Sequence, residues 1–357
     1  MNRVDSSAAT VAMVAQPAMA RWRLVLSVFK LRIGTLIMLT AIAGLAVVPG
    51  GGATPWQSLV LALSVLVASA SAGAFNQYVE ADSDRLMART RSRAFASGAL
   101  QRGPGWLALM AGMLAGAVGA TAWWVNVPAA VFVLLGALTY AIVYTVALKR
   151  RTHWNIVIGG AAGSFAVLAG AAAANPQVGP LGLLLALVLL LWTPPHFWSL
   201  AIANQAQYAA AGIPMLPVVV GKARAARTVH RCAMLLVAVS LLPLAFGAGW
   251  GYGLGAVAGG MHFLRKTAAL AQSPEERGKA MGAFFASMVQ LSAIIAGVLI
   301  DATMGCSESL VARSAGRFLR RRWRRRTVAG PGQWRGAGRP TRRRPACAWR
   351  SALARCQ

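Results

Sequence analysis

Acidic residues are the scarcest charged class in this sequence. The 357 residues include only eight Asp and Glu, against 36 Lys and Arg. All charged residues together make up 12% of the chain, whereas 57% of the residues are hydrophobic. A soluble domain of this length needs far more charge on its surface. The shortage of charge therefore excludes an ordinary soluble protein and predicts a membrane protein.

Cysteine is also scarce. The four cysteines are Cys232, Cys306, Cys347 and Cys356, and no two of them have the spacing of metal ligands. The sequence therefore supports neither a disulfide framework nor a zinc site.

Long hydrophobic runs are what the sequence does have. A helix needs roughly 20 apolar residues to cross a bilayer core about 30 Å thick. Nine such segments can be delimited, separated by short charged or Pro/Gly-rich stretches: 33–49, 59–75, 106–124, 127–148, 156–174, 181–203, 232–248, 250–264 and 281–300. They predict an all-α, polytopic membrane protein with nine transmembrane helices.

The basic residues predict the orientation of these helices. Lys and Arg cluster before the first segment and after the second, fourth, sixth and eighth, whereas the connections after the first, third, fifth and seventh carry no charge. Positive residues favour the cytoplasmic side, so the N-terminus is predicted to be cytoplasmic. We interpret residues 1–22 as a disordered cytoplasmic lead, and residues 23–301 as the transmembrane domain.

The C-terminal stretch 302–357 breaks this pattern. It carries fifteen arginines and a single acid, Glu308, where nine spans would place it outside the cytoplasm. We predict a disordered, Arg-rich tail that is explained by an out-of-frame stretch of GC-rich coding sequence. The alternative is an arm that binds nucleic acid or anionic lipid.

Three of the eight acids lie within five positions, at the end of the second segment. If the helix continues through them, Asn76, Glu80 and Asp84 recur at i, i+4 and i+8 and form one stripe, with Asp82 off it. Oxygen ligands at a membrane edge are costly unless a cation binds them. Mg²⁺ suits the stripe because it takes oxygen ligands and usually binds through one or two carboxylates plus substrate phosphates.

Basic residues accompany the stripe. Arg85, Arg89, Arg91 and Arg93 follow it, and Lys149, Arg150 and Arg151 follow the fourth segment. Guanidinium groups bind phosphate oxygens, so the combination predicts a diphosphate site. The alternative is a solvated helix end with i,i+4 ion pairs beside ordinary cytoplasmic arginines.

The run from Asn76 to Arg93 resembles the first Asp-rich motif of the UbiA superfamily of membrane prenyltransferases. The resemblance continues through Lys149-Arg150-Arg151-Thr152, the stretch 155–163, Trp192-Thr193-Pro194-Pro195-His196-Phe197-Trp198 and Gly212-Ile213-Pro214-Met215-Leu216-Pro217, and covers roughly residues 25–301. The Thr-Pro-Pro-His-Phe-Trp stretch is similar to the haem-farnesylating branch, the protoheme IX farnesyltransferases.

The resemblance implies nine helices around a central cavity that opens toward the cytoplasm of a bacterial inner membrane. It implies that Asn76, Glu80 and Asp84 hold Mg²⁺ on farnesyl diphosphate, and that its phosphates are bound by Arg89, Arg93, Lys149 and Arg150. Haem b would be the acceptor, through one vinyl group. Contact with haem A synthase or terminal oxidase assembly is also implied, and no nucleic-acid partner.

His196 has two interpretations. The resemblance makes it a haem contact, whereas the residues alone favour a core histidine that bonds a backbone carbonyl freed by the two prolines. Tyr140, Tyr144, Phe197 or Trp198 could shield an allylic cation with their ring faces. Gln207 stands where relatives carry Asp, so a second Mg²⁺ is not implied.

Other functions fit less well. A relative that prenylates an aromatic quinone precursor, or a catalytically impaired copy, would share the same motifs. A transporter predicts paired charges at mid-bilayer and inverted repeats, and neither is apparent. A membrane-tethered nucleic-acid binder depends on the tail alone.

Overall fold

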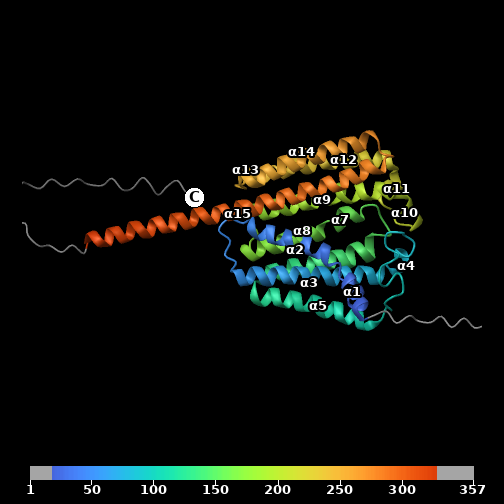
Figure 1. Cartoon of the computed structure of the whole chain (residues 1–357), viewed down its shortest axis with the longest axis horizontal. Helices are drawn as coiled ribbons and strands as arrows, with labels where there is room; N and C mark the ends of the chain where they lie inside the picture. The colour runs from blue at the N-terminus through green and yellow to red at the C-terminus, as the bar shows by residue number, and fades with distance from the viewer. Residues whose placement is uncertain (1–17, 328–357) are drawn as a thin grey trace, which may run out of the picture. The chain divides into compact units, whose positions relative to one another are not determined.

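The computed structural model describes residues 18–327, with side chains described from Trp22 to Met304, and it contains helices, turns and loops over that range. The helices are α1 (Ala18–Val28), α2 (Leu31–Ala46), α3 (Pro55–Val79), α4 (Ala81–Asp84), α5 (Pro104–Trp124), α6 (Val127–Leu138), the π-helix η1 (Thr139–Leu148), α7 (Asn155–Gly159), α8 (Ala161–Ala174), α9 (Pro180–Ala203), α10 (Gln205–Ala210), α11 (Leu216–Val220), α12 (Lys222–Ser240), α13 (Leu242–Ala245), α14 (Trp250–Gln272) and α15 (Arg277–Thr327) (Figure 1).

The predicted all-α membrane fold is confirmed, but the number nine is not. Within the described residues, seven helices are long and apolar enough to cross a membrane, and the bent pair α1–α2 makes an eighth. The remaining candidate, α14, has 23 residues and does not meet the same criterion. Its second half carries His262, Arg265 and Lys266, so its apolar stretch is short.

The helices begin and end close to the predicted segments, and several extend beyond them. Thr54 starts α3 with a capping box, in which its side chain accepts from the Gln57 backbone and Gln57 caps in return, and Pro55 occupies the first turn. The helix α12 begins at Lys222, well before the hydrophobic run that starts at Cys232. Hydropathy marks the apolar part of a helix, whereas capping residues decide where it ends.

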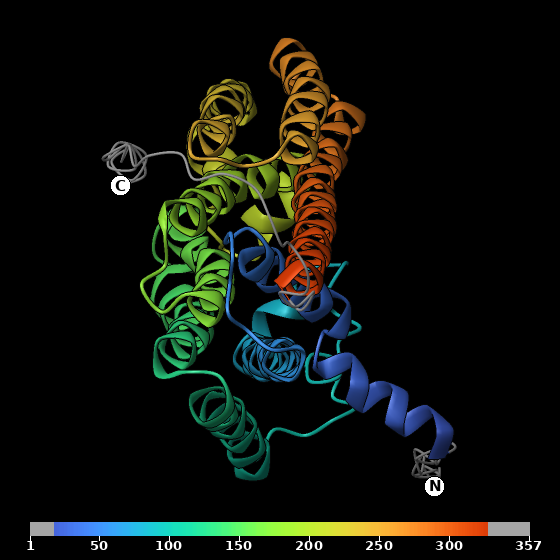
Figure 2. The same ribbon diagram turned by 90° about the vertical axis from the view of Figure 1, so that its left-hand side faces the viewer.

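Close helix contacts hold the bundle together. The helix α2 packs against α3 and α8, α8 packs against α6 and α9, and α12 packs against α9 and α14. Figure 2 shows these helices end on, as a set of roughly parallel spirals. At the α2–α8 contact, Gly170 lies so near the Ala41 carbonyl of α2 that a Cβ atom there would stand 1.8 Å from its oxygen. Only glycine permits this approach.

The chain divides into two units, with the boundary between Cys306 and Ser307. Where a disordered tail was expected from residue 302, α15 continues as a helix to Thr327. Residues 328–357 lie outside the described part, as do residues 1–17 of the expected N-terminal lead, whose last residues belong to α1. The predicted domain division therefore stays a prediction.

Three short helices, α4, α10 and α11, lie at one end of the bundle (Figure 1). Figure 1 places α4, α10 and α11 at the same end, where α3 and α9 also terminate. Basic residues predicted to be cytoplasmic lie at this end, including Arg93 in the loop after α4 and Lys222 at the start of α12. This end of the bundle carries the polar residues considered next.

Replacing Gly170 by Ala is expected to lower the melting temperature of the detergent-solubilised protein. Overpacking of a close helix contact costs about 1–3 kcal/mol, which exceeds the roughly 0.5–1 kcal/mol that Ala contributes over Gly in a helix. The matched control is Gly116→Ala in α5, where no atom lies within 4 Å of the new Cβ. Equal melting temperatures for the two variants would contradict the close contact.

Candidate functional site

The predicted stripe is present, although it crosses the junction between α3 and α4. The helix α3 ends at Val79 and α4 begins at Ala81, but the backbone bonds from Glu80 N to Asn76 O (3.0 Å) and from Asp84 N to Glu80 O (2.8 Å) continue the i→i−4 pattern. Asn76, Glu80 and Asp84 are 2%, 3% and 1% exposed. All three therefore face the protein interior, as the stripe requires.

Each member of the stripe contacts a cationic side chain from another segment. The Lys149 ammonium lies 2.5 Å from the Glu80 carboxylate, and the Arg93 guanidinium lies 2.7 Å from Asp84 Oδ2. The Lys30 ammonium donates to Asn76 Oδ1 at 2.6 Å. Buried charges need such partners, because an isolated ion loses its hydration on burial.

Lys30 was not among the residues predicted for the site. It lies in the two-residue break between α1 and α2, with φ 47° and ψ 41°, and the two helices bend by 46° across the break. Left-handed backbone is uncommon for a residue other than glycine. The sequence placed Lys30 among the cytoplasmic charges, and no local signal indicated that the break would direct it at Asn76.

The other predicted phosphate ligands divide into two groups. Arg150 donates to Ser83 Oγ at 2.7 Å, next to the stripe. Arg89 is exposed in the loop that follows α4. The structure thus brings Arg93, Lys149 and Arg150 to the end of α3 and leaves Arg89 at the surface.

Two tyrosines line the same region. The Tyr140 and Tyr144 rings stack with centroids 5.6 Å apart, and the ammonium groups of Lys30 and Lys149 lie 5.9 and 5.8 Å from the centroids of Tyr140 and Tyr144, respectively. Both tyrosines belong to η1, a π-helix, and such segments are rare and frequent at functional sites. A Cβ at Gly159 would lie 2.7 Å from the Tyr144 ring, so glycine makes room for it.

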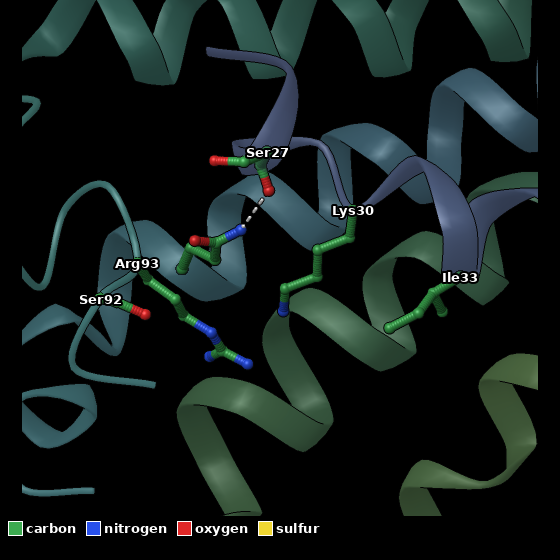
Figure 3. Close-up of a pocket in the computed structure, with 6 residues that line it drawn as sticks. Ser27, Lys30, Ile33, Ser92 and Arg93 are labelled. Carbon is green, nitrogen blue, oxygen red and sulfur yellow. Dashed lines mark hydrogen bonds between the residues drawn. The ribbon is translucent and has the colours of Figure 1, made fainter. Parts of the chain in front are cut away.

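A pocket of about 290 Å³ opens beside the stripe, lined by Ser27, Lys30, Ile33, Gln77, Ser92 and Arg93. The charged ends of Lys30 and Arg93 extend into the same space from different segments (Figure 3). Two cations with hydroxyl and amide neighbours make this pocket suitable for an anion.

The oxygens of the stripe also fit a hard cation. Asp84 Oδ1 is buried and has no hydrogen-bond partner, although its other oxygen pairs with Arg93. No group of three or more His, Cys, Asp or Glu that could hold a metal occurs among the described residues, so the stripe offers two carboxylates and one amide. That donor set matches Mg²⁺, which completes its coordination with water and substrate phosphates.

Comparison with known proteins identifies the family. Residues 37–289 match the UbiA prenyltransferase family. The chain belongs to this family. It is therefore a membrane prenyltransferase enzyme.

Named relatives agree with this assignment. The chain is 51% identical over 282 residues to protoheme IX farnesyltransferase 2 of Paramagnetospirillum magneticum, covering 79% of this chain and 98% of the relative. It is 39% identical to a protoheme IX farnesyltransferase of Alkalilimnicola ehrlichii, covering 78% and 92%.

Solved structures share the fold. A digeranylgeranylglyceryl phosphate synthase superposes with a TM-score of 0.66 at 18% identity, covering 80% of this chain and 99% of the other. A UbiA homologue from Archaeoglobus fulgidus bound to DMAPP and Mg²⁺ superposes with a TM-score of 0.57 at 13% identity, covering 75% and 99%.

His196 lies in the prenyltransferase core, on α9, and is 7% exposed. Its ring stacks between Trp192 and Phe284, with centroids 4.1 and 4.5 Å away, and its Nδ1 lies 2.6 Å from Ser287 Oγ. The prolines Pro194 and Pro195 free the carbonyls of Leu190 and Leu191, but the backbone carbonyl that bonds the His196 ring is that of Phe284 on α15. A serine of α15 holds the histidine.

Gln207 lies in a second pocket of the prenyltransferase, about 450 Å³ in volume, between α9, α10 and the start of α15. The acid that lines this pocket is Glu275, which pairs with Lys222 at 2.9 Å and has a largely exposed side chain. An exposed ion pair of this kind contributes little to stability.

Replacing Arg93 by Met is expected to destabilise the prenyltransferase strongly. The buried Asp84 carboxylate would lose its cation, and breaking a buried pair from one side costs about 3–5 kcal/mol. The matched control is Arg102→Met, because Arg102 pairs with Asp82, whose side chain is 61% exposed, and the expected loss there is about 0–1 kcal/mol. Thermal unfolding in detergent measures both, and similar losses would show that the Arg93–Asp84 pair is solvated.

Proposed function

We propose that this prenyltransferase transfers a farnesyl group from farnesyl diphosphate to a vinyl group of haem b, with Mg²⁺ assisting departure of diphosphate. The acceptor, protoheme IX, and the transferred farnesyl group are those in the name of its 51% identical relative. The observation that carries the proposal is the buried stripe. Its Asp84 has one oxygen without a hydrogen-bond partner and pairs through the other with Arg93. Arg93 and Lys30 together line the neighbouring pocket.

The oxygen-bearing side chains and the basic side chains would bind different partners. Asn76, Glu80 and Asp84 would hold Mg²⁺, which supplies charge neutralisation for the leaving diphosphate. Lys30, Arg93, Lys149 and Arg150 would turn from their present partners to the phosphate oxygens. Preorganised cations of this kind stabilise charge that develops as the bond breaks.

The reaction then follows from the leaving group. The bond between farnesyl C1 and the diphosphate oxygen breaks, and diphosphate keeps the electron pair. The terminal carbon of the haem vinyl group bonds to the allylic cation, water adds to the adjacent carbon, and a proton is released. The stacked faces of Tyr140 and Tyr144 would stabilise the cation, and their position beside two ammonium groups supports this role.

His196 is the residue that we propose to contact haem. The Ser287 hydroxyl donates to Phe284 O at 2.6 Å, so it accepts from His196 Nδ1. That bond favours the tautomer with the proton on Nδ1, in which Nε2 would keep its lone pair for an iron.

Location follows from the basic end of the bundle. We propose that the chain is a multi-pass protein of a bacterial inner membrane, with the N-terminus and the stripe toward the cytoplasm. The clustering of Lys and Arg in the connections at that end supports this orientation. Contact with haem A synthase or terminal oxidase assembly stays a prediction.

Membranes that contain the expressed chain test the proposal directly. Supplied with labelled farnesyl diphosphate, Mg²⁺, haem b and 4-hydroxybenzoate, they are expected to label haem and yield a hydroxyethylfarnesyl product. Label on hydroxybenzoate alone would replace haem by an aromatic quinone precursor. Label on neither acceptor, from folded protein, would indicate a catalytically impaired copy.

Asp84→Asn is expected to lower kcat/KM for farnesyl diphosphate by about 100-fold or more, because one charged metal ligand is lost. The matched control is Asp82→Asn, since Asp82 lies two residues away, off the stripe, with an exposed side chain. Turnover is measured across a Mg²⁺ titration. Near-normal kcat/KM for the Asp84 variant, or equal losses in both, would refute the metal role of the stripe.

A further inference from the structure

Both lysines that contact the stripe are carried by backbone outside regular α-helix. Lys30 occupies the break between α1 and α2, and Lys149 directly follows the π-helix η1. Long side chains on such segments have many alternative conformations, and ordering them costs conformational entropy. Something else must fix the direction in which each lysine leaves the backbone.

A buried amide side chain lies at each of these segments. Gln77 is 4% exposed, and its Nε2 donates to Ser27 O at 3.0 Å and to Val28 O at 2.9 Å. These carbonyls lie at the end of α1, just before Lys30. The C-terminal carbonyls of a helix have no partner within the helix, so the amide satisfies two of them.

The second amide repeats this arrangement. Asn155 is fully buried, and its Nδ2 donates to Lys149 O at 3.3 Å and to Thr152 O at 2.7 Å. Its Oδ1 is buried without a hydrogen-bond partner. Burying an unsatisfied oxygen is costly, so the two donated bonds are what this amide contributes.

Gln77 is also adjacent in sequence to Asn76, the residue that the Lys30 ammonium contacts. Asn76 binds the Lys30 ammonium, while the next residue, Gln77, holds the carbonyls that precede Lys30. One turn of α3 therefore fixes both the tip and the backbone of the same lysine. Asn155 fixes the Lys149 carbonyl, and Glu80 contacts the Lys149 ammonium.

We infer that Gln77 and Asn155 are positioning residues, each of which fixes the backbone at one lysine so that its ammonium group is held ready for a diphosphate. The inference rests on the proposed diphosphate site. It assigns to these two amides an effect on diphosphate affinity that acts through Lys30 and Lys149, respectively.

The test uses the full-length chain in detergent and inorganic diphosphate with Mg²⁺ as the probe, so it does not depend on turnover. Affinity is read from the stabilisation against thermal unfolding as diphosphate is added. Gln77→Met and Asn155→Leu keep approximate shape and remove the donors. Each is expected to raise the apparent Kd for diphosphate about tenfold, because small misplacements of a charged ligand are costly.

Asn126→Leu is the matched control. Asn126 also donates its amide to a backbone carbonyl, Ala172 O at 2.9 Å, and caps α6 at the opposite end of the Val127–Leu148 span from Lys149. It is expected to lower the melting temperature without changing the diphosphate Kd. If Asn155→Leu does not fold, Asn155→Ala, which also removes the donor, replaces it.

Double variants decide whether the amides act through the lysines. Gln77→Met is expected to have little further effect on the diphosphate Kd in a Lys30→Gln background, and Asn155→Leu little further effect in a Lys149→Gln background. The effects on Kd are expected to add in the crossed pairs, Gln77→Met with Lys149→Gln and Asn155→Leu with Lys30→Gln. Additive effects in the matched pairs, or an unchanged Kd in the single amide variants, would overturn the inference alone. An unchanged Kd in both lysine variants would instead overturn the proposed diphosphate site.

Discussion

Two carboxylates buried at the end of a membrane-spanning helix are the constraint on which the rest of the site depends. Glu80 and Asp84 are 3% and 1% exposed, and each meets a cation at 2.5 and 2.7 Å, respectively. Unpaired, such charges would cost several kcal/mol each. The chain must therefore bring basic residues from distant segments to one helix end, and the connections between helices are shaped accordingly.

The irregular segments follow from that requirement. In a straight α-helix the backbone continues along one axis beyond the membrane edge. A break in the helix, or a π-helical turn, changes the direction of the backbone and of the side chains that follow it. Lys30 reaches Asn76 from a break with left-handed backbone, and Lys149 reaches Glu80 from the end of a π-helix. Buried amides replace the regular hydrogen bonds that these segments lack. The same region thus combines irregular backbone with four of the six ion pairs found among the described residues, and irregular backbone is common at functional sites.

Much of this could be predicted from the sequence, for identifiable reasons. Hydrophobic runs show directly in the sequence, so the all-α membrane fold and most helix positions followed from them, and the i, i+4, i+8 spacing placed Asn76, Glu80 and Asp84 on one face. The predicted count of nine spans is not confirmed. The helix α14 does not meet the criterion for a membrane span, because its glycines and its charged second half lower its hydropathy. Lys30 could not be predicted, since its role depends on a backbone angle and on Asn76, which lies 46 positions away. The environment of His196 required the neighbouring helix α15, which supplies Ser287 and Phe284.

Charge pairing also constrains the order of events under the proposed function. Arg93 and Lys149 occupy the carboxylates that a metal would need, and Lys30 occupies the amide oxygen between them. A metal alone would have to displace cations, and a diphosphate alone would draw those cations away and leave buried carboxylates unpaired. If both arrived together, the carboxylates would hold the metal and the cationic side chains would hold the phosphates, so every buried charge would keep a partner. Among the side-chain oxygens of the stripe, Asp84 Oδ1 has no hydrogen-bond partner to lose, so this exchange would begin there.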